Sequence, residues 1–246
     1  MGKKRAFDLT LVVLGALVWV PVLALASLMV LLREGRPVYY KSNRRVSGGE
    51  VIKLTKFRTM VKNADKIANR NTVAIDNNVR FLNIPPDSPL YTPVGRLLER
   101  GGITELPQLV HVLRGDMSIV GNRPLPENVM SCLREEYPYA DDRFLTKAGL
   151  TGPAQLVGRE SLTDSERLKL ESAYCHAARH GYSMWLDLSI LLSTVMIVLG
   201  VRQALGYQGT LDLIERRSRR RSTVTVLAPE SATVVDVVAP AQAMAE

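Results

Sequence analysis

An uncharged stretch of 24 residues near the start of the chain constrains the fold more than any other feature. It runs from Leu9 to Leu32, and as an α-helix it measures ~36 Å, enough to cross a hydrocarbon core of ~30 Å. Basic residues flank it on both sides, namely Lys3, Lys4, Arg5, Arg33, Arg36, Lys41, Arg44 and Arg45. Because basic flanks favour the cytoplasmic side of a membrane, we expect both ends of the stretch on that side.

Three interpretations of this stretch compete. The Ala24-Leu25-Ala26 triplet suggests a signal peptide, but the apolar run continues past the triplet, which argues against cleavage. Pro21 lies near the midpoint and can kink the helix into halves of ~12 residues, each too short to cross a membrane. A re-entrant helix and a kinked single span both stay open, because membrane helices tolerate proline.

Composition narrows the class of protein and the class of partner. The 246 residues suffice for one core with a small appendage. The net charge of +8 indicates an anionic partner, such as an anionic membrane surface or a phosphorylated substrate. We expect no nucleic acid, because the few aromatic residues are not interleaved with the basic runs. Cys132 and Cys175 make no disulfide framework, which is typical of a reduced, cytosol-facing compartment.

The pattern after the apolar stretch predicts a compact domain of the α+β class, mainly α. Val38-Tyr39-Tyr40 and Val51-Ile52-Lys53-Leu54 are strand-like, and Ser47-Gly48-Gly49 between them predicts a small β-hairpin. Helices are predicted over 94–100, from Thr104 as N-cap to Gly115, over 164–180 and over 185–201. A short strand is predicted at 117–120, and loops at 76–90 and 147–158, which are rich in proline or glycine.

The chain therefore divides into a membrane helix (1–33), a central domain (34–203) and a C-terminal segment (204–246). The low aromatic content of 222–246 predicts a disordered tail. A basic cluster before this tail suits either anionic lipid headgroups or a solvated helix end, and it comprises Arg216, Arg217, Arg219, Arg220 and Arg221.

Residues 104–124, TELPQLVHVLRGDMSIVGNRP, form the most chemically loaded stretch of the chain. Its carboxylates are Glu105 and Asp116. Cleavage of a diphosphate needs a nucleophile, neutralisation of the phosphate charge and a metal. Candidate phosphate-binding residues are Arg123, Arg58, Lys56 and Arg44, because a guanidinium group matches phosphate oxygens and an ammonium group supplies charge.

Each of these residues also has a structural interpretation. Glu105 suits the first turn of a helix, Asp116 suits a turn, and each arginine or lysine suits an ordinary surface position. His176 and His180 lie four residues apart on a predicted helix, beside Cys175. They form a chelating pair without a third ligand at a useful spacing, so a zinc site is poorly supported.

Several separate pieces of the chain match one known family in the same order. They are Lys4-Arg5-Ala6-Phe7-Asp8, Pro21, Gly35-Arg-Pro-Val-Tyr-Tyr, Lys56-Phe-Arg-Thr-Met, Val94-Gly-Arg, Glu105-Leu-Pro-Gln, Leu113-Arg-Gly-Asp-Met-Ser-Ile-Val-Gly with Arg123-Pro124, Lys147-Ala-Gly-Leu-Thr-Gly and Trp185-Leu-Asp-Leu. Over about residues 4–200, the chain resembles the bacterial sugar transferases, the monotopic polyprenyl-phosphate phosphoglycosyl transferases.

The resemblance implies a re-entrant helix in the bacterial inner membrane, with 34–203 as a catalytic domain facing the cytoplasm. It implies transfer of a sugar 1-phosphate from a nucleoside diphosphate sugar to polyprenyl phosphate, with Mg²⁺ as cofactor, to initiate glycan or exopolysaccharide assembly. It places the nucleophile at position 104 and a metal ligand at Glu105. The resemblance and the phosphate-binding argument above together give the candidate substrate-binding residues, which are Gln108, Arg123, Pro124, Lys56, Arg58 and Arg44.

The chain departs from the family pattern most sharply at Thr104, where the family has its nucleophilic aspartate; Val20, Ser42, Val46 and Asn122 are lesser departures. A threonine hydroxyl is a poor nucleophile without a base and brings no charge to Mg²⁺. One hypothesis is an active transferase in which Glu105 is the base or attacks directly, with Asp116 as the next candidate. The other is a catalytically reduced, membrane-bound binding or scaffold protein. The sequence leaves the sugar, the lipid length and the oligomeric state open, a homo-oligomer included.

Overall fold

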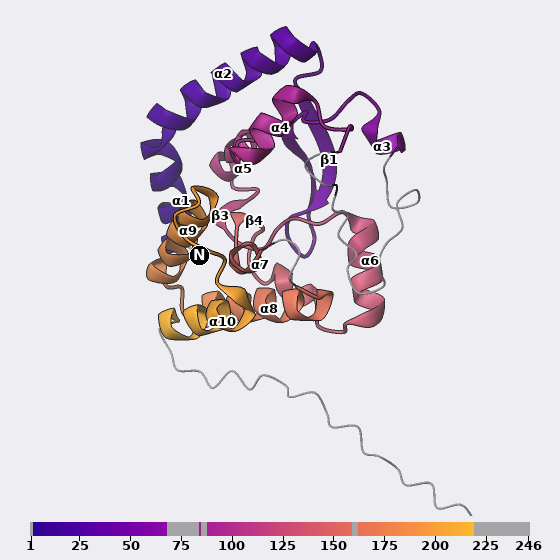
Figure 1. Cartoon of the computed structure of the whole chain (residues 1–246). Coiled ribbons are helices and arrows are strands. Elements are labelled where there is room, and N and C mark those ends of the chain that lie inside the picture. Colours follow the sequence, from indigo (N-terminus) through magenta and orange to yellow (C-terminus); the bar gives the residue numbers. More distant parts are fainter. Residues whose placement is uncertain (1, 68–83, 85–87, 159–161, 219–246) are drawn as a thin grey trace, which may run out of the picture.

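The computed structural model describes residues 2–67, 84, 88–158 and 162–218, and it is mainly helical (Figure 1). The predicted tail at 222–246 and most of the predicted loop at 76–90 lie outside the described residues. The helices are α1 (Gly2–Leu14), α2 (Ala16–Glu34), α3 (Ala64–Ile67), α4 (Pro93–Arg100), the 3-10 helix η1 (Leu106–Gln108), α5 (Leu109–Arg114), α6 (Glu127–Glu136), the 3-10 helix η2 (Ala140–Phe144), α7 (Pro153–Val157), α8 (Asp164–His180), α9 (Met184–Val198) and α10 (Gly206–Arg217). The strands are β1 (Tyr39–Arg45), β2 (Val51–Phe57), β3 (Ser118–Val120) and β4 (Gly149–Thr151).

The N-terminal apolar stretch forms two helices, and the break between them lies at Gly15. The Trp19 indole N–H donates to the Val12 carbonyl oxygen at 2.8 Å, and a side chain inserted into the helical ladder in this way is a recognised cause of a kink. Pro21 lies inside α2, which has 19 residues and is ~28 Å long. The predicted division into halves of ~12 residues at Pro21 is therefore wrong.

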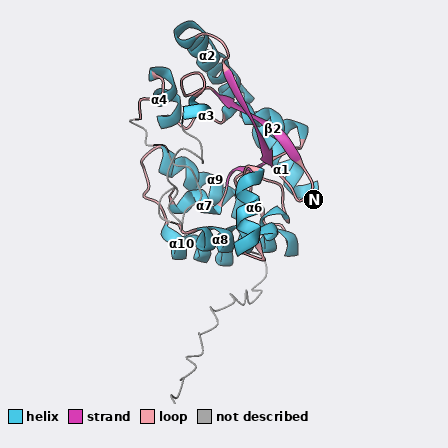
Figure 2. Ribbon diagram, turned by 90° about the vertical axis from the view of Figure 1, so that its right-hand side faces the viewer, coloured by secondary structure: helices cyan, strands magenta, loops and turns pink. Residues whose placement is uncertain are grey.

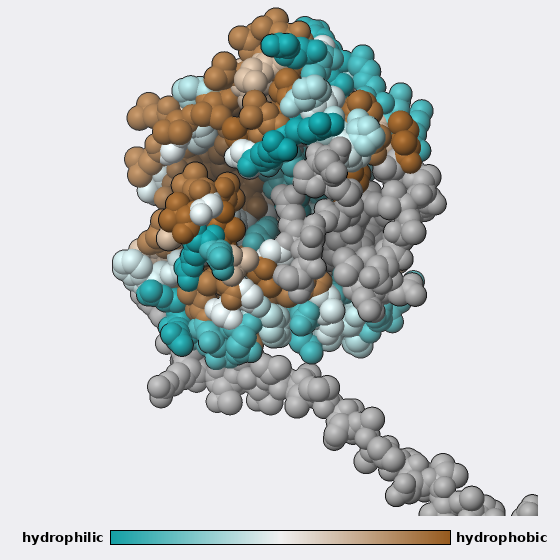
Figure 3. All heavy atoms as spheres, viewed as in Figure 1, coloured by the Kyte–Doolittle hydropathy of each residue, from teal (hydrophilic) through white to brown (hydrophobic). Residues whose placement is uncertain are grey.

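α2 is the one helix in the described part of the chain that is long and apolar enough to cross a membrane, with a mean hydropathy of 2.2. Most of its apolar side chains are exposed in this structure, among them Leu17, Val18, Leu25 and Leu32. α1 and α2 form an arc along one side of the molecule, and Figure 3 shows hydrophobic side chains gathered along the side where α2 and α9 lie.

The predicted hairpin is confirmed as the antiparallel pair β1–β2, in which Tyr39 lies opposite Phe57 and Arg45 opposite Val51. Alternate residues of a strand point to opposite faces of a sheet. Ser42 and Arg44 of β1 therefore share one face with Leu54 and Lys56 of β2. Figure 2 shows the hairpin extending from the group of helices α6 to α10 towards α2.

Residues 147–158 are not the predicted loop, because they contain β4 and α7. β4 pairs in parallel with β3, so Ser118 lies opposite Gly149. A Cβ atom at Gly149 would lie 2.1 Å from the Gly121 amide nitrogen, so the two backbones approach more closely than any side chain permits. The glycines of this segment therefore serve close packing of two strands, and their number misled the prediction.

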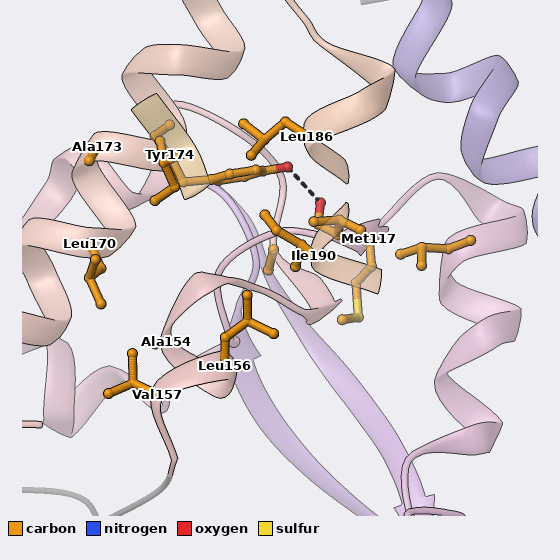
Figure 4. Close-up of a cluster of buried hydrophobic side chains, with 14 of the residues drawn as sticks. Met117, Ala154, Leu156, Val157, Leu170, Ala173, Tyr174, Leu186 and Ile190 are labelled. Carbon is orange, nitrogen blue, oxygen red and sulfur yellow. Dashed lines mark hydrogen bonds between the residues drawn. The ribbon is translucent and has the colours of Figure 1, made fainter. Parts of the chain in front are cut away.

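The main core lies between these strands and the helices α7 to α10. Figure 4 shows Tyr174 of α8, Leu186 and Ile190 of α9, and Leu156 of α7 packed together with Met117. α8 begins and ends at the predicted residues, with Thr163 as its N-cap.

α10 lies in the C-terminal segment that the sequence separates at residue 204. Its buried residues Leu211 and Ile214 join the main core, and the helix packs on α7, α8 and α9. The folded body therefore includes the start of that segment. Arg216 and Arg217 of the basic cluster fall in the last turn of α10, whereas 219–221 lie outside the described residues.

Candidate active site

A partly open pocket brings together most of the residues singled out from the sequence. The hairpin contributes one wall, and the segments around η1 and after β3 contribute the other. Its lining residues are Ser42, Arg44, Leu54, Lys56, Glu105, Gln108, Arg123 and Pro124.

The fold explains why these side chains meet. Ser42, Arg44, Leu54 and Lys56 share one face of the hairpin through the alternation of its strands. The amide of Phe57, at the end of β2, donates to the Thr104 carbonyl oxygen at 3.0 Å, which fixes the hairpin beside the 104–108 segment.

Glu105 and Arg123 form a bidentate ion pair in this pocket. The two guanidinium nitrogens of Arg123 donate to the two carboxylate oxygens of Glu105 at 3.2 and 2.5 Å. The negative charge of Glu105 raises the pKa of the Arg123 guanidinium above its usual value. Both oxygens of Glu105 are therefore already engaged by one cation.

The pocket carries more positive than negative charge. Burial, followed by the positive charge of Arg44, lowers the pKa of the Lys56 ammonium below its usual value. Three cationic side chains, Arg44, Lys56 and Arg123, line the pocket together with one carboxylate, Glu105. Because the cations disfavour one another, a ligand with two adjacent phosphates would relieve the repulsion between them.

Thr104 is buried, at 6% exposure, and it is not among the residues that line the pocket. Its hydroxyl donates to the carboxylate of Glu99, at the end of α4, at 3.0 Å. The prediction that Thr104 caps the next helix is wrong, because η1 begins after Glu105 and has no side-chain cap. The sequence did not predict this contact with Glu99, which, like Thr104, is not among the residues that line the pocket.

Two predicted site residues lie elsewhere. Arg58 donates to the backbone carbonyl oxygens of Pro37 (2.7 Å), Glu34 (2.9 Å) and Gly35 (3.0 Å). It therefore holds the exit of α2 and does not line the phosphate pocket. Asp116 follows α5, at the opposite end of that helix from Glu105, and its carboxylate lies 3.0 Å from His111 Nδ1. Asp116, the next candidate for the chemistry, is not among the residues that line the pocket.

The N-terminal and late motifs meet in a second cluster, whose role the sequence analysis did not assign. Lys4 Nζ donates to the Asp187 carboxylate at 2.6 Å, and the Tyr174 hydroxyl donates to the same carboxylate at 2.8 Å. Asp8 accepts from the Ser118 hydroxyl at 2.9 Å and from the Ile119 amide at 3.1 Å. These contacts attach α1 to β3 and α9, so the motifs at residues 4–8 and 185–188 position the N-terminal helices on the domain.

The described residues contain no group of three or more His, Cys, Asp or Glu side chains placed to hold a metal by themselves. His176 lies 3.2 Å from Asp142, and His180 Nδ1 lies 3.0 Å from the carbonyl oxygen of His176, so the two rings do not converge on a third ligand. Mg²⁺, however, usually binds one or two carboxylates together with substrate phosphates and water. Glu105 fits that pattern.

The sequence pattern of the family described as bacterial sugar transferase matches residues 1–201. The chain is 31% identical over 200 residues to the exopolysaccharide production protein ExoY of Sinorhizobium fredii, covering 80% of this chain and 85% of that protein. It is 32% identical over 198 residues to a UDP-glucose:undecaprenyl-phosphate glucose-1-phosphate transferase of Caulobacter vibrioides, covering 78% and 68%. It is 32% identical over 199 residues to the galactosyl transferase CpsE of Streptococcus agalactiae, covering 80% of this chain but only 42% of that longer protein.

The cationic pocket suits a phosphorylated ligand, and the similar proteins are named as transferases or as a protein of exopolysaccharide production. The match over most of the chain shows that it belongs to the bacterial sugar transferase family.

Proposed function

We propose that the chain transfers a sugar 1-phosphate from a nucleoside diphosphate sugar to polyprenyl phosphate, the first step of assembling an exopolysaccharide or another glycan. Family membership and the name of the Caulobacter vibrioides relative support this reaction. A catalytically reduced scaffold is not favoured, because the similar proteins are named as transferases or as proteins of exopolysaccharide production.

The pocket charge is the observation that carries the proposal. Arg44, Lys56 and Arg123 line one small pocket, and a diphosphate supplies the negative charge that they lack. Arg123 holds one side of the diphosphate while Glu105 keeps its guanidinium oriented. Lys56 and Arg44 neutralise the phosphate charge that grows on the departing nucleotide.

Mg²⁺ is part of the proposal as a cofactor shared between protein and substrate. Glu105 would hold the ion together with the diphosphate, and the ion would polarise the phosphoryl oxygens when bound. The bidentate contact between Glu105 and Arg123 then has to loosen or share the carboxylate, since both oxygens accept from Arg123.

The membrane arrangement follows from the lipid acceptor. We place the α1–α2 unit in the bacterial inner membrane as a re-entrant pair of helices, with both ends of the unit and the catalytic domain on the cytoplasmic side. The apolar exposed surface of α2 and the basic residues at the two ends of the unit support this arrangement. Exposed apolar residues of α9, such as Trp185 and Leu192, extend that surface towards the lipid.

The test is nucleoside monophosphate release by the purified full chain in vesicles that contain polyprenyl phosphate. A panel of UDP-sugars is supplied with Mg²⁺. The proposal predicts that, with at least one sugar, UMP release exceeds one equivalent per protein, and that it does so only when polyprenyl phosphate is present. Binding of UDP-sugars without UMP release from any of them would instead indicate a binding protein.

A further inference from the structure

The carboxylate of Glu99 lies beside position 104, where this chain has a threonine in place of the aspartate of the family pattern. The Thr104 hydroxyl, at the residue where the family has its nucleophilic aspartate, lies 3.0 Å from the carboxylate Oε2 atom of Glu99. Glu99 comes from α4, five residues earlier in the chain, and its side chain is half-buried. Thr104 therefore adjoins two carboxylates: Glu99 through this hydrogen bond, and Glu105 as the next residue along the chain.

The backbone fixes this approach from both sides. After Glu99, the chain turns back through Gly101 and Gly102, whose φ of +65° favours glycine. The Ile103 amide closes the turn by donating to the Leu98 carbonyl oxygen at 2.9 Å. On the other side, the Thr104 carbonyl oxygen is held by the Phe57 amide of β2.

Glu99 also acts electrostatically on the pocket residues. The raised pKa of Arg123 arises first from Glu105, and Glu99 adds to it. Burial lowers the pKa of Lys56, and the charges of both Glu105 and Glu99 oppose that shift. The charge of Glu99 therefore acts on the same cations that the diphosphate would contact.

We infer that Glu99 supplies the carboxylate that position 104 lacks and is the nucleophile of the first half-reaction. The inference rests on the proposed function. One carboxylate oxygen of Glu99 forms a bond to the phosphorus that carries the sugar. The bond between this phosphorus and the oxygen bridging to the other phosphate breaks, and the electron pair leaves with the nucleoside monophosphate.

In the second half-reaction, a phosphate oxygen of polyprenyl phosphate attacks the same phosphorus. The bond to Glu99 breaks, and its electron pair returns to the carboxylate. The products are the sugar-diphosphate lipid and the regenerated enzyme, so neither step requires an oxidant or a further reactant.

The second step distinguishes Glu99 from Thr104. A glutamate carboxylate is the anion of a weak acid, whereas an alkoxide is the anion of an alcohol, which is a far weaker acid, roughly as weak as water. A phosphate oxygen therefore displaces a carboxylate far more easily than a threonine alkoxide. Glu105 is the poorer candidate because Arg123 engages both of its oxygens. Thr104 is a positioning residue that orients Glu99 through its hydroxyl.

The experiment combines a mapped adduct with an exchange of the carboxylate between two positions. The full chain in vesicles is incubated with the UDP-sugar that supports UMP release but without polyprenyl phosphate. It is then digested and analysed by mass spectrometry. We expect a phosphosugar adduct on Glu99. We expect Glu99→Gln to lose the adduct and at least about 10³-fold in UMP release, as for loss of an enzymatic nucleophile.

The double variant Glu99→Gln with Thr104→Asp should regain both the adduct, now at position 104, and UMP release. A structural role for Glu99 predicts no such rescue. Glu215→Gln, which removes an exposed carboxylate from α10, is the matched control and should leave both readouts unchanged.

An adduct mapped to Thr104, Glu105 or Asp116 in the native chain would overturn the inference, and so would full activity of Glu99→Gln. Both outcomes leave the proposed function intact, because UMP release is still observed. Absence of UMP release from the native chain with every sugar would overturn the proposed function and this inference with it. The adduct map of the native chain decides the matter even if Glu99→Gln unfolds.

Discussion

The ion pair between Glu105 and Arg123 sets the charge balance of the pocket at the scale of single residues. Through it, a guanidinium group is held in a fixed orientation, as binding of a diphosphate requires. Lys56 and Arg44 add further positive charge to the same pocket. Arg123 thus contributes a bidentate contact to ligand binding, whereas Lys56 contributes a single positive charge. The two contributions can be tested separately.

Arg123→Lys should weaken binding of the nucleotide sugar by about 1–3 kcal/mol, because a lysine cannot reproduce a bidentate, charge-assisted contact. Titration calorimetry on the full chain in vesicles measures the affinity. Arg114→Lys, on the exposed end of α5, is the matched control. Equal affinities for the native chain and Arg123→Lys would return Arg123 to the role of an ordinary surface charge.

The affinity for the nucleotide sugar should fall at alkaline pH, because Lys56 loses its proton there. Burial and Arg44 lower its pKa, so its positive charge is present at neutral pH and is lost below the ordinary lysine range as the pH rises. Affinity should therefore fall with rising pH before 10.5, the ordinary value. Lys56→Arg, which stays charged, should abolish this fall. A fall of the same size in Lys56→Arg would assign the titration to another group.

Sequence reasoning at this scale succeeded where a residue's role follows from its neighbours along the chain. Glu105, Gln108 and Arg123 were found in one motif and meet in one pocket. The contacts of Arg58 and Glu99 were not predicted, because the partners of both depend on the path of the backbone. Arg58 turns back towards the end of α2, and Glu99 meets Thr104 only because of the Gly101-Gly102 turn.

At the scale of elements, the junction after α2 decides how the membrane segment joins the domain. Arg58 donates to three carbonyl oxygens there, those of Glu34, Gly35 and Pro37. The kink between α1 and α2 lies at Gly15, where the Trp19 indole reaches the Val12 carbonyl oxygen. Sequence reasoning placed the kink at Pro21, because proline is a recognisable signal. The hydrogen bond from the Trp19 indole to the Val12 carbonyl oxygen cannot be recognised from the residue types alone.

Arg58→Ala should destabilise the fold by about 1–3 kcal/mol, because three partly buried carbonyl oxygens lose their charged donor. The melting temperature in detergent measures the loss, and nucleotide-sugar affinity at a temperature where the variant is folded should stay close to native. The opposite pattern, an unchanged melting temperature with weakened binding, would restore Arg58 as a phosphate-binding residue.

Both ends of the α1–α2 unit should be accessible from the same side of the membrane. Single cysteines at Gly2 and Ser47 are introduced after Cys132 and Cys175 are replaced by serine, and they are labelled with a membrane-impermeant reagent in sealed inside-out vesicles. Both should react. Pro21→Leu tests whether the proline discourages a straight span, since leucine restores an amide donor at that position. Labelling of only one site in the native helix would establish a spanning topology.

At the scale of the whole molecule, one polar cluster attaches the apolar helices to the domain. Lys4, Asp187 and Tyr174 join α1 to α8 and α9, and the exposed apolar residues of α2 and α9 lie along the same side (Figure 3). The sequence predicted the hairpin, α4, α8 and α9, because their signals are local. It did not predict the parallel pairing of β3 with β4, since those strands come from distant segments and their close packing requires glycines that resemble a loop.

The path of the phosphate atom tests the central claim most directly. The full chain in vesicles with polyprenyl phosphate and Mg²⁺ is given a UDP-sugar labelled with ³²P in the phosphate next to the sugar. Transfer of a sugar 1-phosphate predicts that the label moves into the lipid fraction while unlabelled UMP is released. Label that remains in water-soluble UDP, with the sugar alone on the lipid, would contradict the account.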